Sequence, residues 1–231
     1  MKTSRAILTL CLAGSLAGCA ATEQASEVQE SGFLGSETYA LLQAGEEGRA
    51  VLSYVSADAN FGQYDKVILE PVTIWGDPDD AALQPEDRTM LADVTYSAFH
   101  EALAKDYEIV TEPGPTTMAV AVAITSAEAG DPALNTVSSI VPQARLLRGA
   151  ASFFTEKPAF VGEAQGEVKA TDSTTGELLG AGVDRRFGSQ SPRVTTDSWE
   201  DVVAIIDYWS ELTRFRLCQE RGGSDCVAPE A

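Results

Sequence analysis

The chain has 231 residues, enough for one domain with a sizeable core, and its 35 acidic and 16 basic side chains give a formal net charge of −19. A surface of this sign repels nucleic-acid phosphates and anionic lipid head groups, so neither is an expected partner of the folded surface. Only residues 140–193 depart from this composition, with seven basic against six acidic side chains. The arginines of this stretch can dock an anionic ligand or simply pair with surrounding carboxylates.

The N-terminus is typical of a bacterial lipoprotein signal. Lys2 and Arg5 precede an apolar run over residues 6–16, and residues 16–19 read Leu-Ala-Gly-Cys. The run is shorter than the roughly 20 residues that a membrane-spanning helix needs, whereas several acyl chains on one cysteine give a stable anchor. We therefore predict a signal peptide over residues 1–18 and acylation, with palmitate for example, at Cys19. The alternative is an ordinary secretory signal followed by a chance cysteine.

Residue 20 is Ala rather than Asp, which in enterobacteria-like sorting favours the outer membrane, with the domain facing the periplasm. Residues 19–31 lack aromatic side chains and are rich in Ala, Glu, Gln and Ser, so we predict a lipidated, flexible tether there. Residues 32–231 then form a single periplasmic domain. The membrane, through Cys19, and an envelope protein are the expected partners, and the oligomeric state is left open.

The first half of the domain predicts strands on either side of a helix. Residues 31–64 read as irregular, partly packed chain. A strand is expected over residues 64–75, a helix with Pro in its first turn over 85–105, and a short strand over 107–110. Residues 118–125 alternate large and small apolar side chains, which is typical of a central strand covered by helices on one face.

The turn before that helix is acidic and resembles a metal-binding loop in composition. Asp77, Asp79 and Asp80 can supply oxygen ligands to calcium, but the glycine and the closing glutamate of a dedicated calcium loop are missing. We therefore predict an exposed turn and no metal.

The second half predicts a hairpin. Residues 134–154 are mixed, with a short helix expected over 144–151. In the strand over 161–171, small and apolar residues are expected inward and polar residues outward: Ala164, Gly166, Val168 and Ala170 inward; Glu163, Gln165, Glu167 and Lys169 outward. A turn at 172–176 leads to a second strand over 178–187.

A long amphipathic helix closes the domain. It begins after a cap at Asp197 or Ser198 and ends before Gly222, with a predicted buried stripe of Val202, Ile205, Ile206, Trp209, Leu212 and Phe215. Arg214, Arg216 and Arg221 complement the negative end of its dipole. The order of elements predicts an α+β fold, a two-layer α/β sandwich with a mixed or largely antiparallel sheet of about five strands and two main helices.

The cysteines fit an oxidising compartment. Cys11 leaves with the signal peptide and Cys19 is acylated, so Cys218 and Cys226 remain to form a disulfide. A metal or redox pair is the alternative, although no CxxC motif is present and no histidine lies nearby in the sequence.

Arg185 breaks a local rule of the last strand. With a period of two it lies on the strand's apolar face, where an unpaired charge is costly, and Glu163 or Asp184 can supply a partner. The alternative is that Arg185 contacts an anionic ligand, with Arg186 on the opposite face of the strand. The candidate contacts for a ligand or partner are Arg145, Arg148, Arg185 and Arg186.

No catalytic residue is predicted. The one histidine, His100, lies in the middle of a predicted helix, where a surface role is expected, and the chain has no GxSxG elbow, HExxH or P-loop. The sequence therefore predicts neither an enzyme nor a cofactor.

Several short motifs occur in a fixed order over residues 31–221: Gly32-Phe33-Leu34, Lys66–Val72, Gly162-Glu163-Ala164, Asp172-Ser173, Thr175–Leu179, Val183–Arg186 and Trp199–Val202. Together they resemble a bacterial lipoprotein family of unknown function, DUF3313. The resemblance implies a membrane-anchored periplasmic domain and brings no reaction with it. The element order is also similar to that of small periplasmic domains of envelope-assembly lipoproteins, which is a likeness of fold only.

These observations favour a non-enzymatic envelope lipoprotein that acts as an interaction or assembly factor. A periplasmic lipoprotein that binds a small ligand is the second reading, and an unrecognised hydrolase is the third. An interaction protein should expose an apolar patch or an open sheet edge. A ligand binder should have a concave pocket near Arg185 or Arg145, and an enzyme should gather ionisable groups in a cleft.

Overall fold

The computed structural model describes residues 22–46, 48–76, 83–131, 161–188 and 198–230. In chain order the elements are β1 (Thr22–Gln24), α1 (Ser36–Tyr39), β2 (Gln43–Ala44), β3 (Leu52–Val55), the 3-10 turn η1 (Phe61–Gln63), β4 (Lys66–Leu69), β5 (Thr73–Ile74), α2 (Pro85–Leu103), β6 (Glu108–Ile109), β7 (Thr117–Glu128), β8 (Glu163–Asp172), β9 (Leu178–Gly188) and α5 (Glu200–Glu220).

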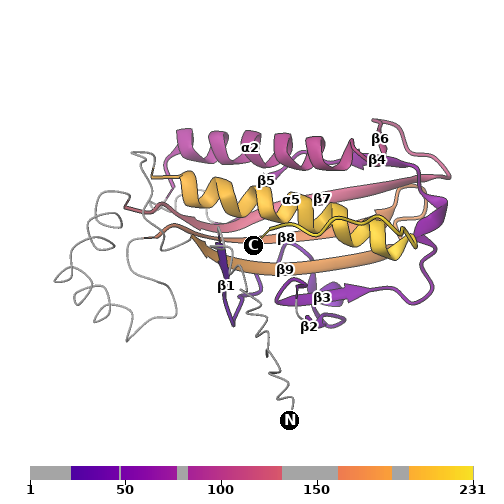
Figure 1. Ribbon diagram of the computed structural model, residues 1–231, viewed down its shortest axis with the longest axis horizontal. Coiled ribbons are helices and arrows are strands. Elements are labelled where there is room, and N and C mark those ends of the chain that lie inside the picture. The colour runs from indigo at the N-terminus through magenta and orange to yellow at the C-terminus, as the bar shows by residue number, and fades with distance from the viewer. Residues whose placement is uncertain (1–21, 47, 77–82, 132–160, 189–197, 231) are drawn as a thin grey trace, which may run out of the picture.

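All the strands of the described residues join one open, mixed sheet. Its order is β2-β3-β9-β8-β7-β4-β6, with β1 also on β9 and β5 also on β7. Strands β7, β8 and β9 run antiparallel to one another, whereas β4 is parallel to both β7 and β6. Helices α2 and α5 lie side by side across one face of the sheet (Figure 1). Neither helix has the length and hydropathy of a membrane-spanning segment, and the described residues contain no other candidate.

The main core lies between this sheet face and the two helices. The long strand β7 contributes alternate large side chains, and both helices face it with apolar stripes. Fully buried members include Val67, Leu91, Phe99, Leu103, Met118, Val120, Ile124, Val202, Ile205 and Ile206. Burying each such side chain contributes about 1.5–3 kcal/mol, so this layer dominates the stability of the domain.

The predicted fold class is confirmed, but the predicted number of strands is wrong. The sheet has nine strands instead of five, because residues 22–55 add β1, β2 and β3, where we expected a tether and irregular chain. The single strand predicted over residues 64–75 is divided into β4 and β5, with Pro71 between them. Proline cannot donate to a strand ladder, so pairing is interrupted there.

The predicted flexible tether over residues 19–31 is wrong from residue 22 onward. Thr22 pairs with Gly188 at the end of β9, and the exposed fractions of Thr22 and Ala25 are only 2% and 4%. The domain therefore begins before residue 32. The signal peptide, Cys19 and the helix expected over 144–151 lie outside the described residues.

The outward face of β8 is also covered, contrary to prediction. Gln165 and Glu167 are 4% and 1% exposed. The Tyr39 hydroxyl donates a hydrogen bond to Glu167 Oε2 at 2.7 Å, and Gln165 Nε2 donates to the backbone oxygen of Gln29 at 2.7 Å. The chain between β1 and β2 thus forms a partial third layer, which satisfies polar groups that we expected to face water.

Helix α5 begins at Glu200, one or two residues later than a cap at Ser198 or Asp197 predicts. Its N-cap is Trp199, which makes no side-chain capping bond, so the predicted cap at Ser198 is wrong; Asp197 lies outside the described residues. The carboxylate of Asp201 instead accepts a hydrogen bond from the backbone N–H of Gly162 at 2.8 Å. The predicted buried stripe is confirmed except at Phe215, which is half-buried.

Candidate functional site

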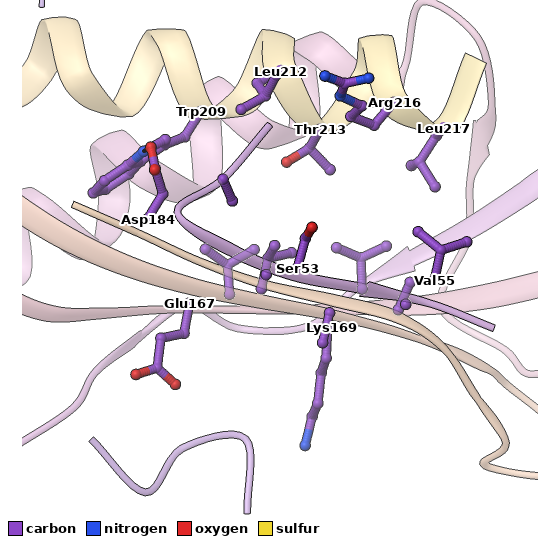
Figure 2. A pocket seen from close by; sticks show the side chains of 18 of the residues that line it. Ser53, Val55, Glu167, Lys169, Asp184, Trp209, Leu212, Thr213, Arg216 and Leu217 are labelled. Carbon is purple, nitrogen blue, oxygen red and sulfur yellow. Dashed lines mark hydrogen bonds between the residues drawn. The ribbon is translucent and has the colours of Figure 1, made fainter. Parts of the chain in front are cut away.

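A cavity lies between helix α5 and strand β9, and the glycines of β9 create it. Gly180 and Gly182 alternate with residues that point to the opposite face, and they pair with Ala170 and Val168 of β8. Because neither glycine has a side chain, the space under the C-terminal half of α5 is not filled. The result is a cavity of 140 Å³ that is bounded by α5, the sheet and strand β3 (Figure 2).

The walls of this cavity are largely apolar. They are formed by η1, α2, β7, β8 and α5, through Phe61, Phe99, Val120, Val122, Val168, Leu212 and Leu217. Two charged residues of β8 at its floor, Glu167 and Lys169, direct their side chains to the other side of the sheet (Figure 2). An apolar cavity of about 150 Å³ stays dry and can bind benzene, so a site of this size suits a small ring or a short acyl segment.

One end of the cavity is closed by Trp209 and Asp184. The indole Nε1 donates a hydrogen bond to Asp184 Oδ2 at 2.8 Å, while Oδ1 accepts from Gln24 Nε2 at 2.6 Å and from the backbone N–H of Val51 at 3.1 Å. Burial raises the pKa of Asp184, although these hydrogen bonds and the nearby Arg186 oppose the rise. Each oxygen of this carboxylate is already engaged, so its role is structural.

The two adjacent arginines of β9 point to opposite faces, as predicted, but the more buried one is Arg186. It is 4% exposed, its Nη1 lies 3.8 Å from Asp184 Oδ2, and its Nε donates to the Thr22 hydroxyl at 2.8 Å. Arg185 lies on the face away from the helices and pairs with Glu163 at 3.2 Å. Of the two partners proposed for Arg185, Glu163 is confirmed, and Asp184 belongs instead to Arg186.

Neither of these arginines lines the cavity, so the pocket expected near Arg185 is found elsewhere. The other two candidate contacts, Arg145 and Arg148, lie outside the described residues.

The rim of the cavity carries two arginines that the sequence analysis did not select. Arg49 Nη2 lies 3.6 Å from Glu220 Oε1. Arg216 donates from Nη1 to the side-chain oxygen of Gln219 at 2.6 Å and from Nη2 to the backbone oxygen of Gly48. The sequence had assigned Arg216 only to the dipole of the last helix. The signal that could have revealed the cavity is the pair Gly180 and Gly182, two successive glycines on the same face of β9, which leave the space beside that face unfilled.

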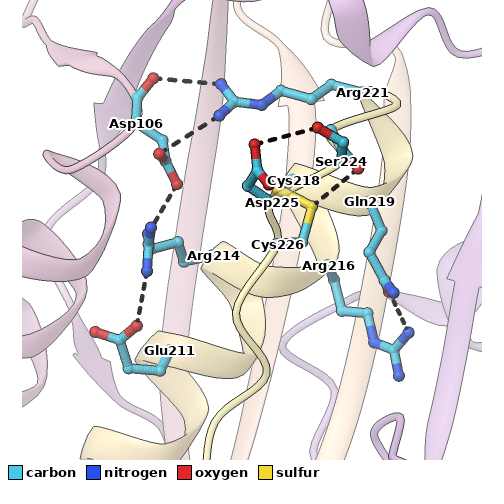
Figure 3. The surroundings of a disulfide bond; sticks show 11 residues. Asp106, Glu211, Arg214, Arg216, Cys218, Gln219, Arg221, Ser224, Asp225 and Cys226 are labelled. Atoms are coloured by element: carbon cyan, nitrogen blue, oxygen red, sulfur yellow. Dashed lines mark hydrogen bonds and ion pairs between the residues drawn. A yellow bond between two sulfur atoms is a disulfide. The ribbon is translucent and has the colours of Figure 1, made fainter.

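The C-terminal half of α5, which forms the roof of the cavity, is held in place by covalent and ionic contacts (Figure 3). The predicted disulfide between Cys218 and Cys226 is present, with the Cα atoms 5.7 Å apart. Arg214 Nε and Arg221 Nη2 lie 2.8 and 3.5 Å from the carboxylate of Asp106, in the turn after α2. The ion pairs tie the roof to the turn after α2, and the disulfide joins it to the C-terminal tail.

The described residues show no assembly typical of catalysis or metal binding. His100 lies in α2, where its ring is 6.0 Å from that of Tyr96. Within the described ranges, no three His, Cys, Asp or Glu side chains are grouped closely enough to hold a metal ion. The acidic turn with Asp77, Asp79 and Asp80 lies outside those ranges.

Distant likenesses to solved structures accompany this geometry. A chain of the PelC dodecamer from Paraburkholderia phytofirmans shares 10% identity, with 75% of this chain and 98% of that chain covered and a TM-score of 0.36. A DUF4136 family protein from Bacteroides thetaiotaomicron shares 12% identity, with 73% of this chain and 95% of that chain covered and a TM-score of 0.33. TM-scores this low, at such identities, support no inference about a shared function.

Comparison with curated proteins finds no match. The model of a family described as "Protein of unknown function (DUF3313)" matches residues 29–213, which confirms the resemblance carried by the short motifs. The match extends from the chain ahead of α1 into the second half of α5, so it includes most of the cavity walls but not Arg216, Leu217 and Glu220. The chain therefore belongs to the DUF3313 family of proteins of unknown function.

Proposed function

We propose that this protein is a non-enzymatic, lipid-anchored envelope protein whose domain binds a small apolar ligand in the cavity between α5 and β9. The observation that carries the proposal is the cavity itself, with a volume of 140 Å³ and walls built from aliphatic and aromatic side chains. Ligand pockets are typically concave and mostly apolar, with a few polar groups that fix orientation. Here the polar groups are the hydroxyls of Ser53 and Thr213, the charged side chains of the rim, and the pair Trp209 and Asp184 at one end.

Two features favour ligand binding over the reading as an interaction or assembly factor. In the described part of the chain, the exposed large hydrophobic residues are scattered over separate elements: Leu41, Val55, Trp75, Tyr96 and Val227. The strands at the two ends of the sheet order, β2 and β6, have two residues each, which offers a partner strand little to pair with. A docking surface of the usual kind thus has less support than the cavity.

The proposal is tested by filling the cavity from the sheet side. A Cβ atom at Gly182 would lie 3.4 Å from Ala50 Cβ and 3.6 Å from the backbone oxygen of Leu52, both ordinary van der Waals distances, so Gly182→Val is chosen to fill the cavity from the sheet side. The matched control is Ala119→Val, because Ala119 pairs with Thr171 on the opposite face of the sheet and does not line the cavity.

The measurement is calorimetric titration with 1-octanol, an uncharged apolar probe. The wild-type chain and Ala119→Val should bind octanol equally, and Gly182→Val should bind it at least about tenfold more weakly while melting no lower than the wild type. Undiminished binding of octanol by Gly182→Val, or no binding by the wild type, would show that the cavity is not a ligand site.

The proposed membrane anchor rests on the sequence, in which Leu-Ala-Gly precedes Cys19 after a short apolar run. Two or more acyl chains on this cysteine would anchor the chain stably, since each buried CH₂ contributes about 0.8 kcal/mol. Cells that express the protein should incorporate labelled palmitate into it, and Cys19→Ser should abolish the label. A wild-type product without label that washes free of membranes would refute the anchor without affecting the cavity.

A further inference from the structure

The guanidinium of Arg216 lacks a carboxylate partner among the described residues, although the chain carries 35 acidic side chains against 16 basic ones. Its two terminal nitrogens donate to uncharged acceptors, the side-chain oxygen of Gln219 and the backbone oxygen of Gly48. Its Nε is buried and has no hydrogen-bond partner there. Because an unmatched, partly desolvated charge is costly, this arrangement suggests that an anion completes it.

The surrounding charges leave Arg216 as the cation available at the rim. Arg49 has carboxylates within ion-pair distance, since its Nη2 lies 3.6 Å from Glu220 and its Nε 4.0 Å from Glu46, whereas Arg216 has none that close in the described part of the chain. Burial, followed by the positive charge of Arg49, lowers the pKa of Arg216, while Glu220, Tyr208 and Glu46 raise it. An anion bound at this point would offset both unfavourable effects.

We propose that the ligand is a single-chain fatty carboxylate whose head group binds Arg216 and whose tail occupies the cavity. This inference rests on the proposed function, because the tail fills the same apolar space. The planar fork of a guanidinium matches the two oxygens of a carboxylate. Leu212, Thr213, Arg216 and Leu217 line the same cavity from one helix, so the head group and the tail would occupy adjoining parts of it.

The opposite end of the cavity fixes the orientation of such a ligand. There the indole N–H of Trp209 is already bound to Asp184, whose carboxylate faces the same end. This end offers an anionic head group no free donor and a carboxylate of like charge. The rim also carries a carboxylate, Glu220, but there Arg216 supplies a cation whose Nε has no hydrogen-bond partner among the described residues. The head group therefore belongs at the rim and the tail points toward Trp209.

The test compares octanoate with 1-octanol at pH 7 by calorimetric titration of the chain from residue 19 with Cys19→Ser, which contains every described residue and requires no detergent. Octanoate should bind about tenfold more tightly than octanol, which corresponds to about 1.4 kcal/mol. Arg216→Met keeps most of the apolar stem, so it should weaken octanoate binding about tenfold and leave octanol binding unchanged. Arg216→Lys, which keeps the charge but not the planar fork, should retain only part of the preference for octanoate.

The matched control is Arg221→Met, because Arg221 lies just after the same helix, pairs with Asp106 and does not line the cavity. It should leave the binding of both probes unchanged. If octanol binds but octanoate binds no more tightly, or if Arg216→Met weakens both equally, the head-group assignment is wrong while the proposed function stands. If octyl phosphate binds tenfold more tightly than octanoate, the carboxylate is the wrong head group. If neither octanoate nor octanol binds, the proposed function itself fails.

Discussion

The two adjacent arginines of β9 offer a sharp test of how burial determines the energy of an ion pair. Arg186→Met should lower the free energy of unfolding by about 3–5 kcal/mol, because it leaves the carboxylate of Asp184 buried without its cation. Arg186 and Asp184 are each 4% exposed, and the Nη1 to Oδ2 distance is 3.8 Å. The variant also leaves the Thr22 hydroxyl without the guanidinium that donates to it.

The same substitution at Arg185 is the matched comparison. Arg185 lies one residue away on the opposite sheet face, and the side chains of Arg185 and its partner Glu163 are 25% and 14% exposed. Ion pairs that reach solvent contribute about 0.2–1 kcal/mol, and methionine retains the apolar stem. Arg185→Met should therefore cost less than about 1 kcal/mol.

Urea unfolding at pH 7, followed by circular dichroism with the disulfide intact, measures both costs. For a domain of this size, a loss of 3 kcal/mol corresponds to a decrease of about 6–12 °C in Tm. Equal losses in the two variants, or a larger loss in Arg185→Met, would show that the buried pair does not carry the energy assigned to it.

Three further predictions concern the disulfide, a buried carboxylate and a helix contact. Replacing Cys218 and Cys226 together by serine should cost roughly 2–3 kcal/mol, since the bond closes a short loop in the unfolded chain; urea midpoints measure it, and an unchanged midpoint would contradict it. Burial raises the folded-state pKa of Asp184, so the folded state binds this proton more tightly and the group's contribution to stability falls as pH rises from about 3.9 through the folded pKa. Asp184→Asn should remove that part of the pH dependence, and an identical slope in both proteins would refute the assignment. Gly166→Ala would place a Cβ 2.8 Å from the Trp209 ring, so it should lower the free energy of unfolding by about 1–3 kcal/mol. Thermal unfolding measures this loss, and an unchanged Tm would contradict the prediction.

The long elements could be predicted from the sequence because their patterns are local. Helix α2 was expected over residues 85–105 and is Pro85–Leu103, and strand β9 was expected over 178–187 and is Leu178–Gly188. Each element is long enough that the spacing of its apolar residues is clear even where single residues depart from the pattern. The order of elements around them then gave the fold class.

The short strands could not be predicted, because their formation depends on distant partners. Thr22–Gln24 forms β1 only through its pairing with Arg186–Gly188, more than 160 residues later in the chain. The composition of the surrounding residues 19–31, rich in Ala, Glu, Gln and Ser, is typical of a linker. The polar face of β8 was misassigned for the same reason, since nothing in its own sequence shows that the chain around Tyr39 covers Glu167.

The cavity illustrates a different limit of sequence reasoning. Gly180 and Gly182 are visible in the sequence, but a glycine in a strand can equally mark a bulge or a close backbone approach. Only because α5 crosses β9 do the absent side chains of these glycines leave an enclosed space between helix and strand. Arg216 likewise gains its significance from the neutral acceptors around it, which no spacing rule predicts.

The early start of strand β1 limits how far the domain can extend from a lipid bilayer. If Cys19 is acylated, three peptide links separate the anchored residue from Thr22, which is fixed to β9, and a fully extended chain of three residues spans at most about 11 Å. The acidic domain must then lie close to the lipid head groups, and the short linker restricts its orientation. An amphiphile that leaves that bilayer would then meet the folded domain within about one nanometre of the surface.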